Sequence, residues 1–159
     1  MELKESILYS KALSFAAEKH SEQTRKNGTP YILHPVKVSM ILARQGYDAR
    51  YQIVALFHDL LEDTDATEED LRIFCDDEMI TAIKLVTKHK GQPESEYIDN
   101  ILNNTMAKAV KNADRIDNLS DLVNSNSESF KEKYMKETKE FFLGRFSKEL
   151  DDVYYGIQI

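Results

Sequence analysis

The sequence has little of what an exported protein uses to hold its fold together. Its 159 residues contain one cysteine, three prolines, five glycines and no tryptophan. Because Cys75 has no second cysteine to pair with, no internal disulfide can form, and we expect a reducing compartment such as the cytoplasm. A chain of this length can bury roughly 70% of its unfolded surface in one hydrophobic core. We therefore expect residues 1–159 to fold as a single globular domain without disulfides.

Long hydrophobic segments are also missing. The longest unbroken apolar run spans residues 53–57, far short of the ~20 residues that a membrane-spanning helix needs. The N-terminus has acidic side chains at Glu2 and Glu5, where a signal peptide would carry bases. These features predict a soluble protein with no membrane partner.

Positive charge is in deficit. The chain has 21 lysines and arginines against 28 aspartates and glutamates, which gives a net charge of -7. Proteins that bind nucleic acids or anionic membranes rely on a broad basic surface, so we expect neither partner. The acidic excess lies in residues 61–103, whereas the loop at residues 20–34 is polar and basic. This balance is compatible with a small anionic substrate held in a local basic pocket.

Few glycines and prolines mean few helix breakers, and the apolar residues recur at helical rather than alternating spacing. The pattern predicts an all-α protein, folded as a compact multi-helix bundle. The helix over residues 50–61 is apolar on most sides, so we expect it at the centre of the core. The other expected helices run from residue 3 to before Gly28, over 35–44, just after a capping box at Thr67, over 77–87, over 97–122 as one helix or two, over 130–146, and to residue 155.

The central helix carries charge that needs an explanation. His58, Asp59, Glu62 and Asp63 place four ionisable groups within six positions of an apolar segment. On a continuous helix His58 would lie beside Glu62, and Asp59 beside Asp63, because residues four apart share a face. Burying unpaired charges is costly. A divalent cation would offset that cost.

A cation at this position needs further ligands from elsewhere in the chain. His34, just before Pro35, and Asp114, on another largely apolar helical stretch, are the best candidates. Two imidazoles and two carboxylates suit Mn²⁺, Fe²⁺, Co²⁺ or Zn²⁺ better than Ca²⁺. The alternative is a buried salt-bridge network among the same histidines and acids, without a metal.

Three blocks of sequence, taken in order, resemble a known family. They are QTRKNGTPYILHP at residues 23–35, HDLLEDT at 58–64 and VKNADR at 110–115. Together they resemble the HD-domain hydrolases that act on the guanosine alarmones ppGpp and pppGpp, and the chain's size is closest to the stand-alone small alarmone hydrolases. The resemblance implies an HD-domain fold and a cytoplasmic enzyme that removes the 3′-pyrophosphate, leaving GDP or GTP.

The resemblance also implies roles for nine residues. The metal ligands would be His34, His58, Asp59 and Asp114, with Mn²⁺ the usual ion. The residues that position water and handle protons would be Glu62 and Asp63. The residues beside the nucleotide substrate would be Arg25, Lys26 and Asn118.

Three positions depart from the pattern of these hydrolases. They usually have Leu where this chain has Asn112, His or Tyr where it has Asp117, and a base where it has Ser120. An added acid and a lost base near the phosphate pocket would weaken binding of a highly charged nucleotide. Two alternatives therefore stay open: an HD-domain phosphohydrolase for another nucleotide or phosphorylated metabolite, and a nucleotide-sensing module without turnover. The sequence leaves a homo-oligomer possible.

Overall fold

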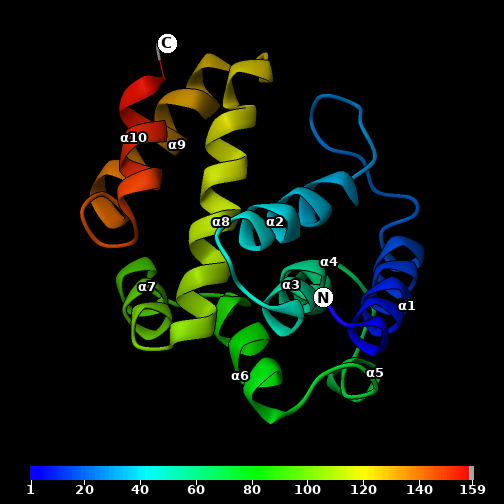
Figure 1. Ribbon diagram of the computed structural model, residues 1–159. Helices are drawn as coiled ribbons and strands as arrows, with labels where there is room; N and C mark the ends of the chain where they lie inside the picture. The colour runs from blue at the N-terminus through cyan, green and yellow to red at the C-terminus, as the bar shows by residue number, and fades with distance from the viewer. Residues whose placement is uncertain (158–159) are drawn as a thin grey trace.

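Helices follow one another along the chain. The computed structural model describes residues 1–157, and no strand is present among them. None of the helices it describes is long and apolar enough to cross a membrane. The prediction of an all-α, multi-helix bundle is confirmed (Figure 1). In chain order the helices are α1 (Leu3–Lys19), α2 (Leu33–Arg44), α3 (Ala49–Phe57), α4 (Leu60–Asp63), α5 (Glu68–Leu71), α6 (Asp77–Val86), α7 (Glu94–Leu102), α8 (Thr105–Asp121), the 3-10 turn η1 (Leu122–Asn124), α9 (Glu128–Phe141) and α10 (Lys148–Gly156).

The core is built around α3 and α8. Helix α3 packs against α1, α2, α6 and α8, and its residues 53–57 are at most 1% exposed. Helix α8, yellow-green in Figure 1, passes through the middle of the bundle and contacts α2, α3, α6, α7 and α10. Its apolar side chains recur every three or four residues and so form a stripe that faces the core. The buried members of that stripe include Met106, Ala109, Val110, Ala113 and Ile116.

The central helix is shorter than the sequence predicts. A continuous helix over residues 50–61 is wrong, because α3 ends at Phe57 and α4 starts only at Leu60. The Ala55 carbonyl, which would accept the Asp59 N–H in a continuous helix, is taken by the backbone N–H of His58 (3.4 Å) and by its Nδ1 (2.6 Å). The tighter turn leaves His58 and Asp59 between two helices rather than within one.

Local capping explains other helix boundaries. The predicted capping box is present, since Thr67 Oγ1 accepts from the Asp70 N–H (3.2 Å) and Asp70 accepts from the Thr67 N–H (2.9 Å). The helix expected to reach residue 146 ends at Phe141 instead. Gly144 follows with φ +72°, a left-handed conformation that only glycine adopts readily, and the chain turns there towards α10.

Candidate metal centre and active-site cavity

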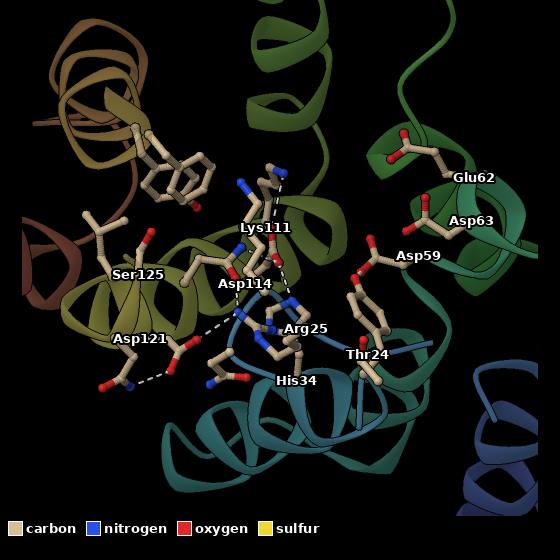
Figure 2. Close-up of a pocket in the computed structure, with 18 residues that line it drawn as sticks. Thr24, Arg25, His34, Asp59, Glu62, Asp63, Lys111, Asp114, Asp121 and Ser125 are labelled. Carbon is tan, nitrogen blue, oxygen red and sulfur yellow. Dashed lines mark hydrogen bonds and ion pairs between the residues drawn. The ribbon is translucent and has the colours of Figure 1, made fainter. Parts of the chain in front are cut away.

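One cavity gathers the residues that the sequence predicts to be functional. It has a volume of about 390 Å³ and lies between the loop after α1, the first turn of α2, the α4 segment and the C-terminal part of α8 with α9 (Figure 2). His58 is not part of the lining but contacts two residues that are. The predicted residues that line the cavity are Arg25, Lys26, His34, Asp59, Glu62, Asp63, Asp114 and Asn118.

His34 lies in the first turn of α2 and points at α8. Its Nε2 is 2.8 Å from Asp114 Oδ1, and its Nδ1 is 2.7 Å from Asp117 Oδ2. The imidazole is 2% exposed, so both contacts are shielded from water. Burial by itself would lower the pKa of His34, but the hydrogen bonds with Asp114 and Asp117 outweigh burial and raise it.

His58 approaches the same carboxylate from the break between α3 and α4. Its Nε2 lies 3.2 Å from Asp114 Oδ1 and 3.1 Å from Asp59 Oδ2. Burial opposes the charged form of His58, yet the Asp59 and Asp114 carboxylates raise its pKa well above the usual value. Burial would raise the pKa of Asp59, but the charge of His58 outweighs it and lowers that pKa to about 2.

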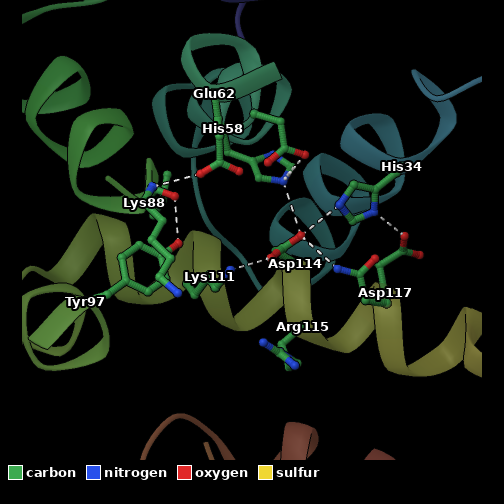
Figure 3. Close-up of polar contacts among 12 residues, drawn as sticks. His34, His58, Glu62, Lys88, Tyr97, Lys111, Asp114, Arg115 and Asp117 are labelled. Carbon is green, nitrogen blue, oxygen red and sulfur yellow. Dashed lines mark hydrogen bonds and ion pairs between the residues drawn. The ribbon is translucent and has the colours of Figure 1, made fainter. Parts of the chain in front are cut away.

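Asp114 is the centre of this group. Its Oδ1 contacts both imidazoles and accepts from Asn118 Nδ2 at 3.3 Å, while its Oδ2 is 3.1 Å from Lys111 Nζ (Figure 3). Burial would raise the pKa of Asp114, but the nearby charge of Lys111 and the hydrogen bonds to the two histidines hold it well below the usual value. The carboxylate is therefore ionised at neutral pH although it is buried.

The arrangement of the two imidazoles fits a divalent cation. Each holds Nδ1 against an acceptor, the Asp117 carboxylate for His34 and the Ala55 carbonyl for His58. Metal-binding histidines have this arrangement, because the hydrogen bond made by one ring nitrogen fixes the proton there and leaves the other nitrogen as ligand. The remaining lone pairs face carboxylate oxygens, which repel them unless a proton or a cation lies between. Ligand atoms of His34, His58 and Asp59 lie within 4.8 Å of one another.

A second cluster of carboxylates continues from this centre along α4. Oxygen atoms of Asp59, Glu62 and Asp63 also lie within 4.8 Å of one another. Burial, together with the charges of Asp59 and Glu62, raises the pKa of Asp63 to about 6. Glu62 is held from outside the helix, since its Oε1 accepts from the backbone N–H of Lys88 at 2.9 Å (Figure 3).

The basic side of the cavity comes from the loop between α1 and α2. The backbone N–H of Arg25 donates to the Thr29 carbonyl (2.8 Å), and Gly28 at φ +85° closes the turn between them. Arg25 Nη2 lies 3.0 Å from Asn118 Oδ1 and 3.4 Å from Asp121 Oδ2, so the loop is attached to α8. Lys26 Nζ stands 3.3 Å from the centre of the Phe130 ring on α9.

Several residues of the site were not predicted from the sequence. Tyr31 donates its hydroxyl hydrogen bond to Asp59, and Lys111 pairs with Asp114. Asp121, Phe130 and Tyr134 line the cavity. Tyr31 and Lys111 lie inside the sequence blocks that carry the family resemblance, which was the only signal that pointed to them. Phe130 and Tyr134 lie beyond those blocks, and nothing local marks them.

The three departures from the family pattern do not lie in the cavity. Asp117 is behind His34, and Ser120 is exposed with its hydroxyl on the Ile116 carbonyl (2.8 Å). Asn112 lies on another side of α8, where it accepts from Ser147 Oγ at 2.8 Å. None of the three lines the cavity. The expected weakening of nucleotide binding by Asp117 and Ser120 therefore has no direct contact behind it and stays a prediction.

The sequence matches a known protein family over most of its length. The HD domain matches residues 12–143. This chain belongs to the HD-domain family. The resemblance seen in the three sequence blocks is thereby confirmed, and the expected fold with it.

Individual relatives sharpen the placement of this HD-domain protein. It is 34% identical over 142 residues to the guanosine-3′,5′-bis(diphosphate) 3′-pyrophosphohydrolase MESH1 of Xenopus tropicalis, covering 84% of this chain and 79% of that protein. It is 39% identical over 140 residues to the guanosine-3′,5′-bis(diphosphate) 3′-pyrophosphohydrolase of Aquifex aeolicus, but spans only 20% of that longer protein. A solved structure of a metazoan ortholog of SpoT that hydrolyses ppGpp superposes with a TM-score of 0.78 at 29% identity, over 93% of this chain and 94% of that one.

Proposed function

We propose that this HD-domain protein is a metal-dependent pyrophosphohydrolase that removes the 3′-pyrophosphate of ppGpp or pppGpp, releasing pyrophosphate and GDP or GTP. One observation carries the proposal: two imidazoles and two carboxylates converge at one end of a cavity whose rim is formed by the basic pair Arg25 and Lys26. The relatives bearing that activity in their names, at 34% and 39% identity, support it. We also infer a cytoplasmic location, because the free Cys75 suits a reducing compartment.

His34, His58, Asp59 and Asp114 are the proposed ligands, and Mn²⁺ is the proposed ion. A bound divalent cation lowers the pKa of the attacking water and stabilises negative charge on the phosphoryl oxygens. The protein prepares the ligands in advance, since Tyr31 holds Asp59 and the Ala55 carbonyl orients His58. Lys111 fixes the other oxygen of Asp114 at 3.1 Å. Little side-chain rearrangement is then needed when the cation binds.

Glu62 and Asp63 are the proposed proton carriers. Hydrolysis needs one group to take a proton from the attacking water and another to deliver one to the departing 3′ oxygen. Burial and the charges of Asp59 and Glu62 raise the pKa of Asp63 to about 6, which suits this carboxyl to hold and release a proton near neutral pH. The Lys88 N–H holds the Glu62 carboxylate in place at 2.9 Å.

Arg25, Lys26 and Asn118 are the proposed substrate-binding residues. Arg25 presents a planar guanidinium that suits bidentate phosphate recognition, and Asn118 fixes its position by accepting from Nη2. Lys26 adds a second positive charge at the same rim. The apolar wall beyond it, formed by Leu122, Phe130 and Tyr134, offers a surface for the nucleoside part of the substrate.

Product analysis by chromatography tests the proposal. Protein loaded with Mn²⁺ should convert ppGpp to GDP with one pyrophosphate released per turnover. His58→Ala should abolish the reaction, whereas the matched control His89→Ala, which removes an exposed imidazole, should retain it. Intact ppGpp in the presence of loaded protein, with hydrolysis of another nucleotide or phosphorylated metabolite from a panel, would overturn the substrate assignment. Tight ppGpp binding without any product would instead indicate a sensing module.

A further inference from the structure

The imidazole of His34 is held between two carboxylates of one helix. Asp114 and Asp117 are three residues apart on α8, which is close to one helical turn, so both side chains reach the same partner. Asp114 Oδ1 is 2.8 Å from Nε2, and Asp117 Oδ2 is 2.7 Å from Nδ1 (Figure 3). One carboxylate faces the cavity and the other is on the far side of the ring.

Asp117 has no other evident purpose in the fold. It is 7% exposed and does not line the cavity. Among the described residues, the only hydrogen-bond or ion-pair partner of its side chain is the His34 ring. A buried carboxylate is costly unless a positive charge compensates it. A neutral imidazole provides only an N–H, whereas an imidazole bound to a cation through its other nitrogen carries part of that cation's charge.

We propose that Asp117 is a positioning residue for the metal centre: it holds the proton of His34 on Nδ1 and thereby keeps Nε2 available as a ligand. The inference rests on the proposed function, because it takes the cation at His34, His58, Asp59 and Asp114 as given. Asp117 itself touches neither substrate nor cation. Outer partners of this kind typically change metal affinity by about 10- to 100-fold when removed.

The second histidine shows why this role can be tested by mutation. His58 Nδ1 is held by a backbone carbonyl, that of Ala55 at 2.6 Å, so no substitution removes its partner. The partner of His34 is a side chain, and a charged one, which draws the Nδ1 proton more strongly and makes Nε2 a better electron donor. His34 should therefore be the ligand whose strength depends on one replaceable residue.

Direct titration with Mn²⁺, followed by the electron paramagnetic resonance of the free ion, measures the effect without any enzymatic turnover. Asp117→Ala should weaken binding by about 10- to 100-fold. Asp117→Asn, whose amide oxygen still accepts from Nδ1–H, should lose less and should keep the volume of the buried side chain. Asp99→Asn is the control, because it removes one acid that lies outside the cavity and pairs with Arg145 rather than with either histidine. Its Mn²⁺ affinity should stay within about twofold of the original.

A spectroscopic signature separates this role from general loss of structure. In Zn²⁺-loaded protein labelled with ¹⁵N-histidine, His34 Nδ1–H should give a downfield, slowly exchanging proton that Asp117→Ala abolishes, while the His58 signal persists. Unchanged Mn²⁺ affinity together with an unchanged His34 signal would overturn the proposal for Asp117 alone. Failure of the unmodified protein to bind Mn²⁺ would overturn the metal centre as well. If Asp117→Ala does not fold, Asp117→Asn decides by the same two readouts.

Discussion

Arg115 should be the arginine on which the stability of this protein depends most. It is 4% exposed, and its guanidinium carbon lies 4.1 Å from the centre of the Tyr134 ring and 4.0 Å from that of Phe142. Nη2 pairs with Glu137 at 2.7 Å. These contacts join α8 to α9 and the segment after it, so Arg115 also fixes the position of the Tyr134 side chain at the cavity wall.

The expected loss on replacing Arg115 with alanine follows from those contacts. Each cation–π contact at a desolvated site is worth about 2 kcal/mol. The ion pair adds little, because the Glu137 side chain is 32% exposed and solvent screens the pair. Part of this cation–π stabilisation is offset by the cost of burying the Arg115 guanidinium. Its Nε adds to that cost, because it has no hydrogen-bond partner among the described residues. We expect a net loss of about 2–4 kcal/mol, or about 4–16 °C in Tm for a chain of this size.

Arg145 provides a matched control for this prediction. It forms an ion pair of the same length, 2.7 Å, with Asp99, but its side chain is 37% exposed and has no aromatic partner among the described residues. Arg145→Ala should cost no more than about 1 kcal/mol. Urea unfolding of both variants measures the difference between their free energies of unfolding. A third variant, Arg115→Lys, keeps the positive charge but loses the planar guanidinium. Equal losses from Arg115→Ala and Arg145→Ala would refute the reasoning.

Four further predictions concern protonation and binding. Burial raises the pKa of the Cys75 thiol to about 12, so at pH 8 a disulfide reagent should label the folded protein far more slowly than the unfolded one; equal rates would show that the thiol is accessible. The pKa values of His34 and His58 are raised, so in metal-free protein both imidazoles keep a proton to higher pH than a free imidazole does. Mn²⁺ must displace those protons, and its affinity should rise with pH by up to tenfold per unit for each proton; calorimetric titrations at several pH values measure this, and a constant affinity would contradict it. For the same reason, the metal-free fold should lose stability as the pH rises through these folded-state pKa values. Lys26→Gln should raise KM for ppGpp about tenfold with little change in kcat, because Lys26 contributes to binding rather than to chemistry. Steady-state kinetics measures both constants, and a lower kcat at unchanged KM would contradict this.

The sequence predicted the helices better than it predicted the contacts between them. Apolar spacing located the longer helices, because that spacing is set by which face is buried, but it did not locate all their ends: α3 stops at Phe57 rather than 61, and α9 at Phe141 rather than 146. The break after Phe57 was not predictable in the same way, since it depends on the His58 side chain reaching back to the Ala55 carbonyl. Apolar periodicity continues through Leu60 and Leu61 and conceals the break.

The candidate ligands were predictable, but the residues that orient them were not. Charged side chains on apolar segments stand out in a sequence, and this singled out His58, Asp59 and Asp114. A residue that only orients a metal ligand by a hydrogen bond is not marked in this way in the sequence. From the sequence we expected Asp117 to be an added acid near the phosphate pocket, whereas its Oδ2 lies 2.7 Å from His34 Nδ1 and the residue is outside the cavity lining. The side of the His34 imidazole that the Asp117 carboxylate contacts depends on how α8 is rotated about its axis against α2, which the sequence does not show.

The charge of the cavity determines the order in which its ligands can bind. Five acids line it against three bases, Arg25, Lys26 and Lys111, so the metal-free cavity has a formal charge of -2, or -1 when His34 is protonated. A substrate as anionic as ppGpp is repelled by that charge until a divalent cation balances it. We therefore expect Mn²⁺ to bind first. In the variant Glu62→Gln, chosen to slow turnover, stoichiometric Mn²⁺ should strengthen ppGpp binding in calorimetry by at least about tenfold. Equal ppGpp affinity with and without Mn²⁺ would show instead that the basic rim alone holds the nucleotide.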